Sequence, residues 1–235
     1  MTIFADLNYT SLTMKIILFI ILAFVKLTTA QAPDEYMLKG HAAFASFNNK
    51  KAVEFYEYAF NEAPDDYFVM INLAKAYNAA GDEAQYKKNK DESEFYVKKG
   101  VELSEKIVKA FPDSGEAYAY LSLSYGLYAE HVGGRDRIKM SRKIEQNAKK
   151  AISLKPDFYL PYIVLGIYYR KLASLGWFER AFANTFFGSV PEGTYEDSKK
   201  MLEKALSIDP DIILAAYNLS ITYRQLDNTK KEIEY

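Results

Sequence analysis

The side chains that could do chemistry in this sequence are few and widely spaced. Its two histidines, His41 and His131, lie far apart, and there is no cysteine. A chain without cysteine has neither a disulfide framework nor a thiolate nucleophile, and two isolated histidines do not make a metal site. The sequence also contains no serine-hydrolase, zinc-protease or phosphate-loop motif. We therefore predict a protein that is not an enzyme and needs no metal or cofactor, in which each histidine has a structural role.

Cationic side chains gather directly after a glycine-containing turn, residues 131–134. The five cations are Arg135, Arg137, Lys139, Arg142 and Lys143. Cations at a helix N-terminus are electrostatically unfavourable, so this cluster is a candidate site for an anion or a lipid headgroup, with Arg135, Arg137 and Arg142 as its core. The alternative is a solvated helix face. The net charge of −1 provides no overall positive field, so we expect no nucleic-acid partner.

An aromatic segment, residues 174–193, contains the only tryptophan of the chain. The candidate binding residues in this insertion are Trp177, Phe178, Arg180, Phe182 and Phe186. A spacing of three and four positions places the phenylalanines on one face of a short helix. We expect Gly188 to end this helix and Thr194 to cap the next one, with Asp197 three residues later completing a capping box.

The elements that must position these residues are helical repeats. Four segments end in a proline followed by aspartate, at Pro64, Pro112, Pro156 and Pro210. After each proline, a leucine, a small residue and an aromatic recur at the same places, as in Leu73-Ala74-x-x-Tyr77. This pattern resembles the tetratricopeptide repeat, a helix–turn–helix unit of about 34 residues. The resemblance predicts an all-α fold, a tetratricopeptide-type α-solenoid of about four to five helix–turn–helix repeats with insertions, over residues 33–235.

The repeats are longer than the standard unit. The prolines are spaced by 48, 44 and 54 residues, so the excess must lie in turns or in longer helices. We expect a first hairpin over residues 36–62 that is broken at Asn48-Asn49, and a next helix over residues 66–80 that ends at Gly81-Asp82. Further first helices are predicted over residues 114–130 and 211–226. The 20 tyrosines and 15 phenylalanines supply an aromatic core for one helical domain.

The N-terminal residues have the pattern of a targeting signal. A lysine precedes the apolar run 16–25, and Ala30-Gln31-Ala32 matches a signal-peptidase site, so we expect a signal peptide over residues 1–32, with Met14 as a possible start. The mature chain would then begin at Pro33 and be periplasmic or secreted. The alternative is a membrane anchor formed by residues 16–25. Ten residues of helix rise only about 15 Å, roughly half of the hydrocarbon core, which favours the signal peptide.

The insertion carries a narrower resemblance. Trp177 and Arg180, then Ala183, Phe187-Gly188, Pro191 and Thr194-Tyr195, are similar to the corresponding segment of the regulator of microtubule dynamics family. The likeness covers about residues 110–226. It implies a relation to eukaryotic proteins tied to microtubules and organelle membranes, one branch of which binds phospholipid, and to exported bacterial proteins. The signal peptide argues against a microtubule role for this chain. A weaker resemblance exists to the helical component of tripartite ATP-independent periplasmic transporters.

The tetratricopeptide register also predicts a binding groove. In such repeats, positions 2, 5, 9 and 12 of each first helix point inward, and the carboxylate clamp of chaperone-tail receptors is absent from these positions. The expected groove is apolar with a cationic rim, which suits an amphipathic helix or an amphiphile with an acidic end. In the alternative, the insertion helix fills the groove with Phe178, Phe182 and Phe186. The predicted groove residues are Phe68, Ile71, Lys75, Leu123, Ile163, Ile167, Arg170, Tyr217, Ile221 and Arg224.

Three hypotheses for the function follow from this sequence. The first is an extracytoplasmic scaffold that binds a protein or peptide partner, as repeat solenoids do. The second is a carrier or sensor of an amphiphilic, lipid-like ligand. The third is a membrane-tethered organiser similar to the eukaryotic relatives, which requires that residues 16–25 stay uncleaved, because only then would the chain associate with a membrane.

Overall fold

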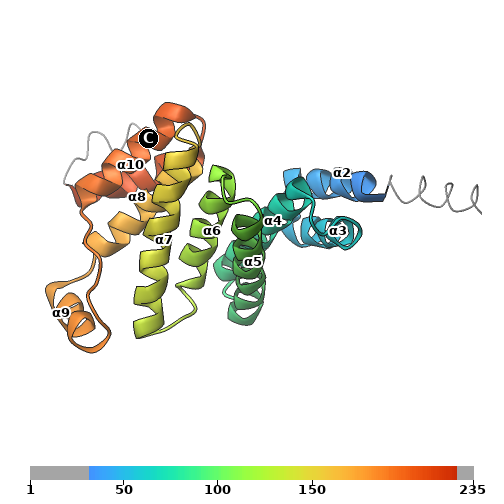
Figure 1. Cartoon of the computed structure of the whole chain (residues 1–235). Helices are drawn as coiled ribbons and strands as arrows, with labels where there is room; N and C mark the ends of the chain where they lie inside the picture. The colour runs from blue at the N-terminus through green and yellow to red at the C-terminus, as the bar shows by residue number, and fades with distance from the viewer. Residues whose placement is uncertain (1–31, 227–235) are drawn as a thin grey trace, which may run out of the picture. The chain divides into compact units, whose positions relative to one another are not determined.

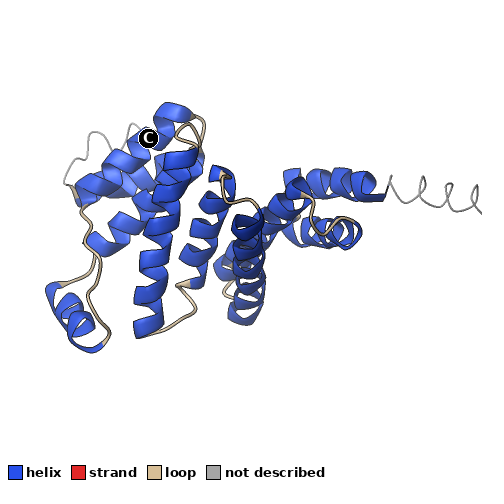
Figure 2. Ribbon diagram, viewed as in Figure 1, coloured by secondary structure: helices blue, strands red, loops and turns tan. Residues whose placement is uncertain are grey.

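The computed structural model describes residues 32–226, with Trp177 and Phe178 described by their backbone only. The predicted signal peptide and the last residues, 227–235, lie outside this part of the chain. All regular elements between residues 32 and 226 are helices, so the predicted all-α class is confirmed (Figure 2). The described residues divide into two compact units, with the boundary between Val69 and Met70.

The first unit contains one helical hairpin, formed by α2 (Ala32–Ala45) and α3 (Asn49–Glu62). The turn lies at the predicted Asn48, whose side chain caps α3 by accepting a hydrogen bond from the Lys51 amide. The two helices approach closely because Gly40 has no side chain where the Tyr56 ring packs against it. The Tyr56 hydroxyl is 2.8 Å from Nδ1 of His41, so this histidine has the structural role that we predicted.

The next hairpin is formed by α4 (Tyr67–Tyr86) and α5 (Lys90–Ala110). The prediction that Gly81 ends the first of these helices is wrong, because α4 continues through it. A Cβ at Gly81 would lie 2.5 Å from a methyl group of Val97, so this glycine allows close helix packing and is not a stop signal. The excess residues lengthen both helices to 20 and 21 residues, against 14 in α6.

The later helices repeat one arrangement. First helices α6 (Gly115–Tyr128), α8 (Leu160–Ala173) and α11 (Ile213–Gln225) alternate with second helices α7 (Gly134–Leu154) and α10 (Tyr195–Ile208). Each second helix packs against the first helices on both sides of it: α7 against α6 and α8, and α10 against α8 and α11 (Figure 1). This arrangement confirms a tetratricopeptide-type solenoid with a short extra helix, α9 (Trp177–Phe186), between α8 and α10.

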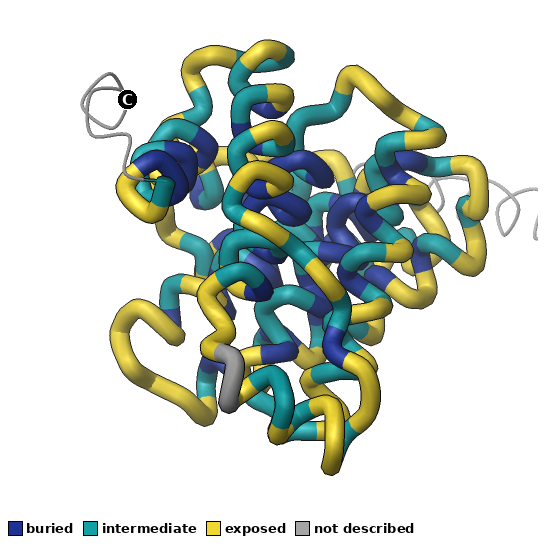
Figure 3. Tube along the Cα trace, turned by 90° about the vertical axis from the view of Figure 1, so that its left-hand side faces the viewer, coloured by how far each residue is buried: buried dark blue, intermediate teal, exposed yellow. Residues whose placement is uncertain are grey.

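Neighbouring repeats are joined by tyrosines with buried or partly buried rings. Tyr125 of α6 donates a hydrogen bond to Glu105 of α5, and Tyr223 of α11 donates one to Glu203 of α10. Tyr169 of α8 donates to a carboxylate of α7 at 3.3 Å. Burial, together with that carboxylate, raises the pKa of Tyr169 to about 12, so the hydroxyl remains a donor. Figure 3 shows how buried and exposed residues alternate along the helices.

The insertion is held at its two ends by a single side chain. Arg180 of α9 donates to the carbonyl oxygens of Leu172, at 2.7 Å, and Pro191, at 3.0 Å. Gly188 follows the end of α9 with a φ of +103°, a conformation that favours glycine, and Val190 is buried in the core. Thr194 caps α10 in the predicted capping box with Asp197.

A pair of glycine substitutions tests the close packing. A Cβ at Gly166 of α8 would lie 2.5 Å from the Leu202 side chain, whereas Gly126 of α6 has open space around it. We expect Gly166→Ala to lower the free energy of unfolding by about 1–3 kcal/mol through overpacking. Gly126→Ala should raise it by up to about 1 kcal/mol, because alanine favours a helix. Urea denaturation of the full chain measures both; shifts of equal sign would contradict the packing.

A second prediction concerns the insertion. Arg180→Ala removes two charge-assisted hydrogen bonds, so backbone amides of residues 176–191 should exchange with deuterium about tenfold faster or more. Hydrogen exchange read by mass spectrometry localises this change. Arg135→Ala, at an exposed arginine of α7, is the matched control and should leave that segment unchanged. Unaltered exchange in the Arg180 variant would show that the arginine does not hold the insertion.

Candidate functional site

The predicted groove residues do not form one open surface. Ile71 and Ile163 are buried in the core, so the prediction that they line a groove is wrong for these two. Neighbouring helices cover them because the first helices pack against one another. The partly buried members of the set are Lys75, Leu123, Ile167, Arg170 and Ile221. Phe68 is exposed and belongs to the first unit, while Tyr217 and Arg224 are exposed on α11.

Among the first helices of the later repeats, α11 presents an open apolar surface. Ile213, Leu214 and Tyr217 are 83%, 51% and 61% exposed, and we call these three residues the α11 apolar row. Positions 213 and 214 lie one helical turn from position 217, so the three share a side of the helix. The opposite side of α11 is also apolar and is buried, with Leu219 and Tyr223 in the core. A helix that is apolar on both sides has one side available for a partner.

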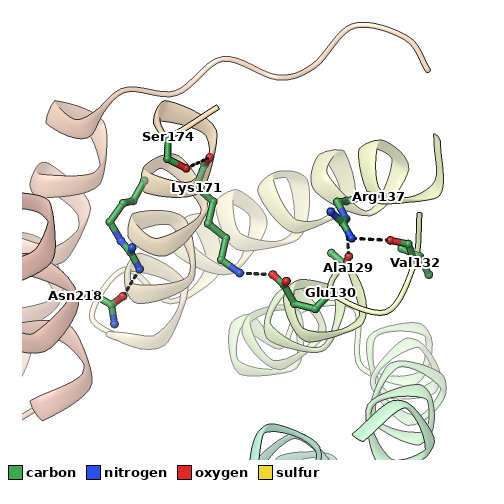
Figure 4. Close-up of polar contacts among 8 residues, drawn as sticks. Ala129, Glu130, Val132, Arg137, Lys171, Ser174 and Asn218 are labelled. Atoms are coloured by element: carbon green, nitrogen blue, oxygen red, sulfur yellow. Dashed lines mark hydrogen bonds and ion pairs between the residues drawn. The ribbon is translucent and has the colours of Figure 1, made fainter. Parts of the chain in front are cut away.

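Polar contacts link the first helices to one another. Ser124 of α6 donates to Asn78 of α4 at 3.0 Å, and Lys171 of α8 pairs with Glu130 at the end of α6 (Figure 4). Burial raises the pKa of Asp82 on α4, and the charge of Lys171 opposes that rise. The contacts between the first helices are therefore more polar than we expected. Residue spacing does not predict these contacts, because each joins helices that lie far apart in the sequence.

Arg170 joins α8 to α11. One of its terminal nitrogens donates to Oδ1 of Asn218 at 2.7 Å, and its buried Nε has no acceptor (Figure 4). Burial lowers the pKa of this guanidinium. The predicted cationic rim is thus correct in one respect only: Arg224 is exposed, whereas Arg170 is partly buried between the helices. Asn218 was missed as a site residue, because an asparagine in a helix has no distinctive sequence signal.

The predicted anion patch is largely engaged in structural contacts. Arg137 donates to the carbonyl oxygens of Ala129 and Val132, which follow the end of α6 (Figure 4). Arg142 donates to the carbonyl oxygen of Ser189 at 3.0 Å, after the insertion helix. These contacts explain why cations stand near the start of α7. All three predicted residues are exposed, and Arg135 is the one left for an anion, because Arg137 and Arg142 are engaged.

The insertion helix presents an aromatic surface. Phe182 and Phe186 are 48% and 59% exposed, with ring centroids 4.7 Å apart. The alternative in which these two side chains fill the groove is therefore wrong. Phe187 covers the start of α7, where a Cβ at Gly134 would lie 2.8 Å from its ring. The predicted roles of the Trp177 and Phe178 side chains lie outside what the structure describes.

The second histidine also has structural partners. Nε2 of His131 is 3.0 Å from Ser93 Oγ, which donates to the carbonyl oxygen of Gly81. Because Ser93 is fully buried and its hydrogen is engaged, the pair does not act as a nucleophile and base. A pocket of about 180 Å³ lies beside it, lined by Gln85, Lys88, Lys90, Ser93, Glu130 and His131.

Two negative findings apply to the described part of the chain. Between residues 32 and 226, no group of three or more histidine, aspartate or glutamate side chains is placed to hold a metal ion. In the same residues, no helix has the length and apolar character needed to cross a membrane.

Comparison with known structures agrees with the fold. A thermophilic tetratricopeptide protein of Thermus thermophilus superposes with a TM-score of 0.61 at 18% identity, over 86% of this chain and 87% of that one. At this identity the similarity concerns the fold alone.

Comparison with curated sequences identifies relatives. Regulator of microtubule dynamics protein 2 of Bos taurus is 26% identical over 153 residues, which are 65% of this chain and 37% of the relative. Protein 3 of Xenopus laevis is 28% identical over 66% of this chain and 33% of its own length. Protein 1 of Bos taurus is 23% identical over 91% of this chain and 71% of its own length. The chain thus spans about two fifths of the length of several relatives that it matches.

The family model for regulator of microtubule dynamics protein 1–3 matches residues 38–235. The match begins in the first helical hairpin and is longer than the stretch, residues 110–226, on which the resemblance in the sequence rested. The chain therefore belongs to the regulator of microtubule dynamics protein 1–3 family.

Proposed function

We propose that this chain is a non-enzymatic interaction module that binds a segment of a partner protein across α8 and α11. The observation that carries the proposal is the α11 apolar row, three exposed apolar side chains on a helix whose other side is already packed. Tetratricopeptide solenoids bind extended or helical segments along their first helices. Covering about 300 Å² of apolar surface there would contribute about 7 kcal/mol before the costs of association.

The proposed partner is a protein and not a small amphiphile. A carrier of a lipid-like ligand needs an enclosed apolar cavity. The pocket beside His131 is lined by polar side chains, and the α11 apolar row is open to solvent. The names of the relatives give those proteins a role in microtubule dynamics. Because this chain spans about two fifths of their length, we do not extend that role to it.

The proposed compartment is extracytoplasmic, and this part of the proposal is supported by sequence alone. The signal-peptide pattern of residues 1–32 is its support, and almost all of that pattern lies outside the described residues. The third hypothesis, a membrane-tethered organiser, requires residues 16–25 to remain on the mature chain, whereas the extracytoplasmic scaffold requires their removal.

Site-specific crosslinking tests the binding surface. A photoreactive phenylalanine at Tyr217, introduced in the native cells, should give a discrete adduct that mass spectrometry identifies as one protein. The matched control is Tyr86 of α4, a tyrosine whose exposed fraction, 88%, is larger than that of Tyr217. Leu214→Asp should weaken the Tyr217 adduct by placing a charge in the α11 apolar row. Equal adducts at both positions, or a lipid adduct at Tyr217, would reject the proposed surface.

Sequencing of the mature N-terminus tests the compartment. Chain purified from the native cells should begin at Pro33, because signal peptidase cleaves after the Ala30-Gln31-Ala32 site. Cell fractionation should place the same species outside the cytoplasmic fraction. A mature chain that retains residues 16–25 would instead support the membrane-tethered organiser.

A further inference from the structure

The charge of Arg170 is unmatched where it lies, between α8 and α11. Its single hydrogen bond to a side chain reaches Asn218, a neutral acceptor, at 2.7 Å. Its Nε is buried without an acceptor, and no carboxylate of residues 32–226 lies within ion-pair distance of the guanidinium. Taking a cation out of water without a counter-ion costs free energy, so the position is unfavourable unless something else compensates it.

Other cations in the same part of the molecule have either a carboxylate partner or two hydrogen-bond acceptors. Lys171, the next residue, pairs with Glu130. Arg137 and Arg180 each donate to two backbone carbonyl oxygens. Arg170 has neither a carboxylate partner among residues 32–226 nor a second acceptor, and in this it differs from these three cations.

Apolar residues lie close in sequence to Arg170 and to its partner Asn218. Tyr217 precedes Asn218 on α11 and is 61% exposed, and Leu214 lies one turn earlier. The backbone carbonyl of Leu214 accepts a hydrogen bond from Asn218 at 2.8 Å, which fixes the orientation of the amide that meets Arg170. On α8, the partly buried Ile167 lies about one turn before Arg170. A ligand on this surface would meet apolar contacts first and a cation at their centre.

We propose that Arg170 is the anchor for a carboxylate of the bound partner segment, an aspartate or glutamate flanked by apolar residues. This inference rests on the proposed function, since it names the chemistry of the partner at the same surface. The planar fork of a guanidinium matches a carboxylate in geometry, and its single positive charge matches a monoanion. A bound carboxylate beside the terminal nitrogens of the guanidinium would supply the counter-ion that the site lacks.

A peptide selection tests the inference with the partner unidentified. The full chain is used to select from a displayed library of random 12-residue peptides, and the enriched sequences are counted. The wild-type chain should enrich peptides with aspartate or glutamate between apolar residues. Arg170→Gln should still enrich apolar peptides but lose the acidic preference, and Arg170→Glu should change the preference to lysine or arginine. Lys171→Gln is the matched control and should select as wild type does.

Affinity and stability measurements complete the test. One enriched acidic peptide should bind Arg170→Gln about 10- to 100-fold more weakly than wild type, with a smaller loss in Arg170→Lys. Glutamine is too short to reach Asn218 but carries no charge to bury, so the two effects on stability oppose each other, and the melting temperature of Arg170→Gln is measured beside its affinity. A loss of binding that only follows unfolding would therefore be recognised.

The failure of the inference differs from the failure of the proposed function. If peptides are enriched and Leu214→Asp abolishes the enrichment, but the Arg170 variants keep the acidic preference, then the carboxylate anchor is wrong and the surface is right. If no peptide is enriched over the Leu214→Asp chain, the proposed surface itself is wrong. Vesicles of phosphatidylserine and phosphatidylcholine that bind wild type and not Arg170→Gln would overturn both in favour of a lipid headgroup.

Discussion

Close approach of helices is the constraint on which this structure depends. At Gly40, Gly81 and Gly166 a side chain of the partner helix occupies the space where a Cβ would be, namely Tyr56, Val97 and Leu202. Each of these pairs lies inside one repeat and allows its two helices to bury their apolar sides against each other. Tyrosines of α6, α8 and α11 then join each of these helices to the second helix before it through a carboxylate, as between α11 and α10. A solenoid built in this way is stabilised by contacts between neighbours.

The repeat architecture could be predicted because its determinants are local. A proline ends each helical segment, and a leucine, a small residue and an aromatic recur at fixed distances after it. The insertion was predictable for the same reason, since Gly188 and the Thr194–Asp197 capping box act on their own neighbours. Gly81 shows the limit of this reasoning. In the sequence, a glycine that ends a helix looks the same as a glycine that allows a neighbouring helix to pack closely. The position of Val97 in the structure shows that Gly81 is of the second kind.

The candidate site was predicted less well because its determinants are not local. Ile71 and Ile163 occupy inward positions of the repeat, but the separation of adjacent first helices decides whether they are open, and that separation depends on the whole stack. Arg137 and Arg142 stand in a cluster of cations that resembles an anion site, yet each donates to a carbonyl oxygen of another segment. Arg170 was singled out for its charge, whereas its distinguishing property is the absence of a carboxylate partner among residues 32–226.

The way in which Arg180 holds the insertion has a consequence for how this chain can vary. Leu172 and Pro191 lie at the two ends of the insertion, and Arg180, which lies inside it, donates to both, so the loop is closed by one of its own residues. The entropic cost of lengthening a closed surface loop rises only slowly with its length. Because Arg180 belongs to α9, a length change inside this helix would displace the arginine, so tolerated changes must lie outside α9 and keep the position of Arg180. We therefore expect that in any related protein with this insertion, the arginine and the two ends of the loop keep their relative positions even where the rest of the segment differs in length.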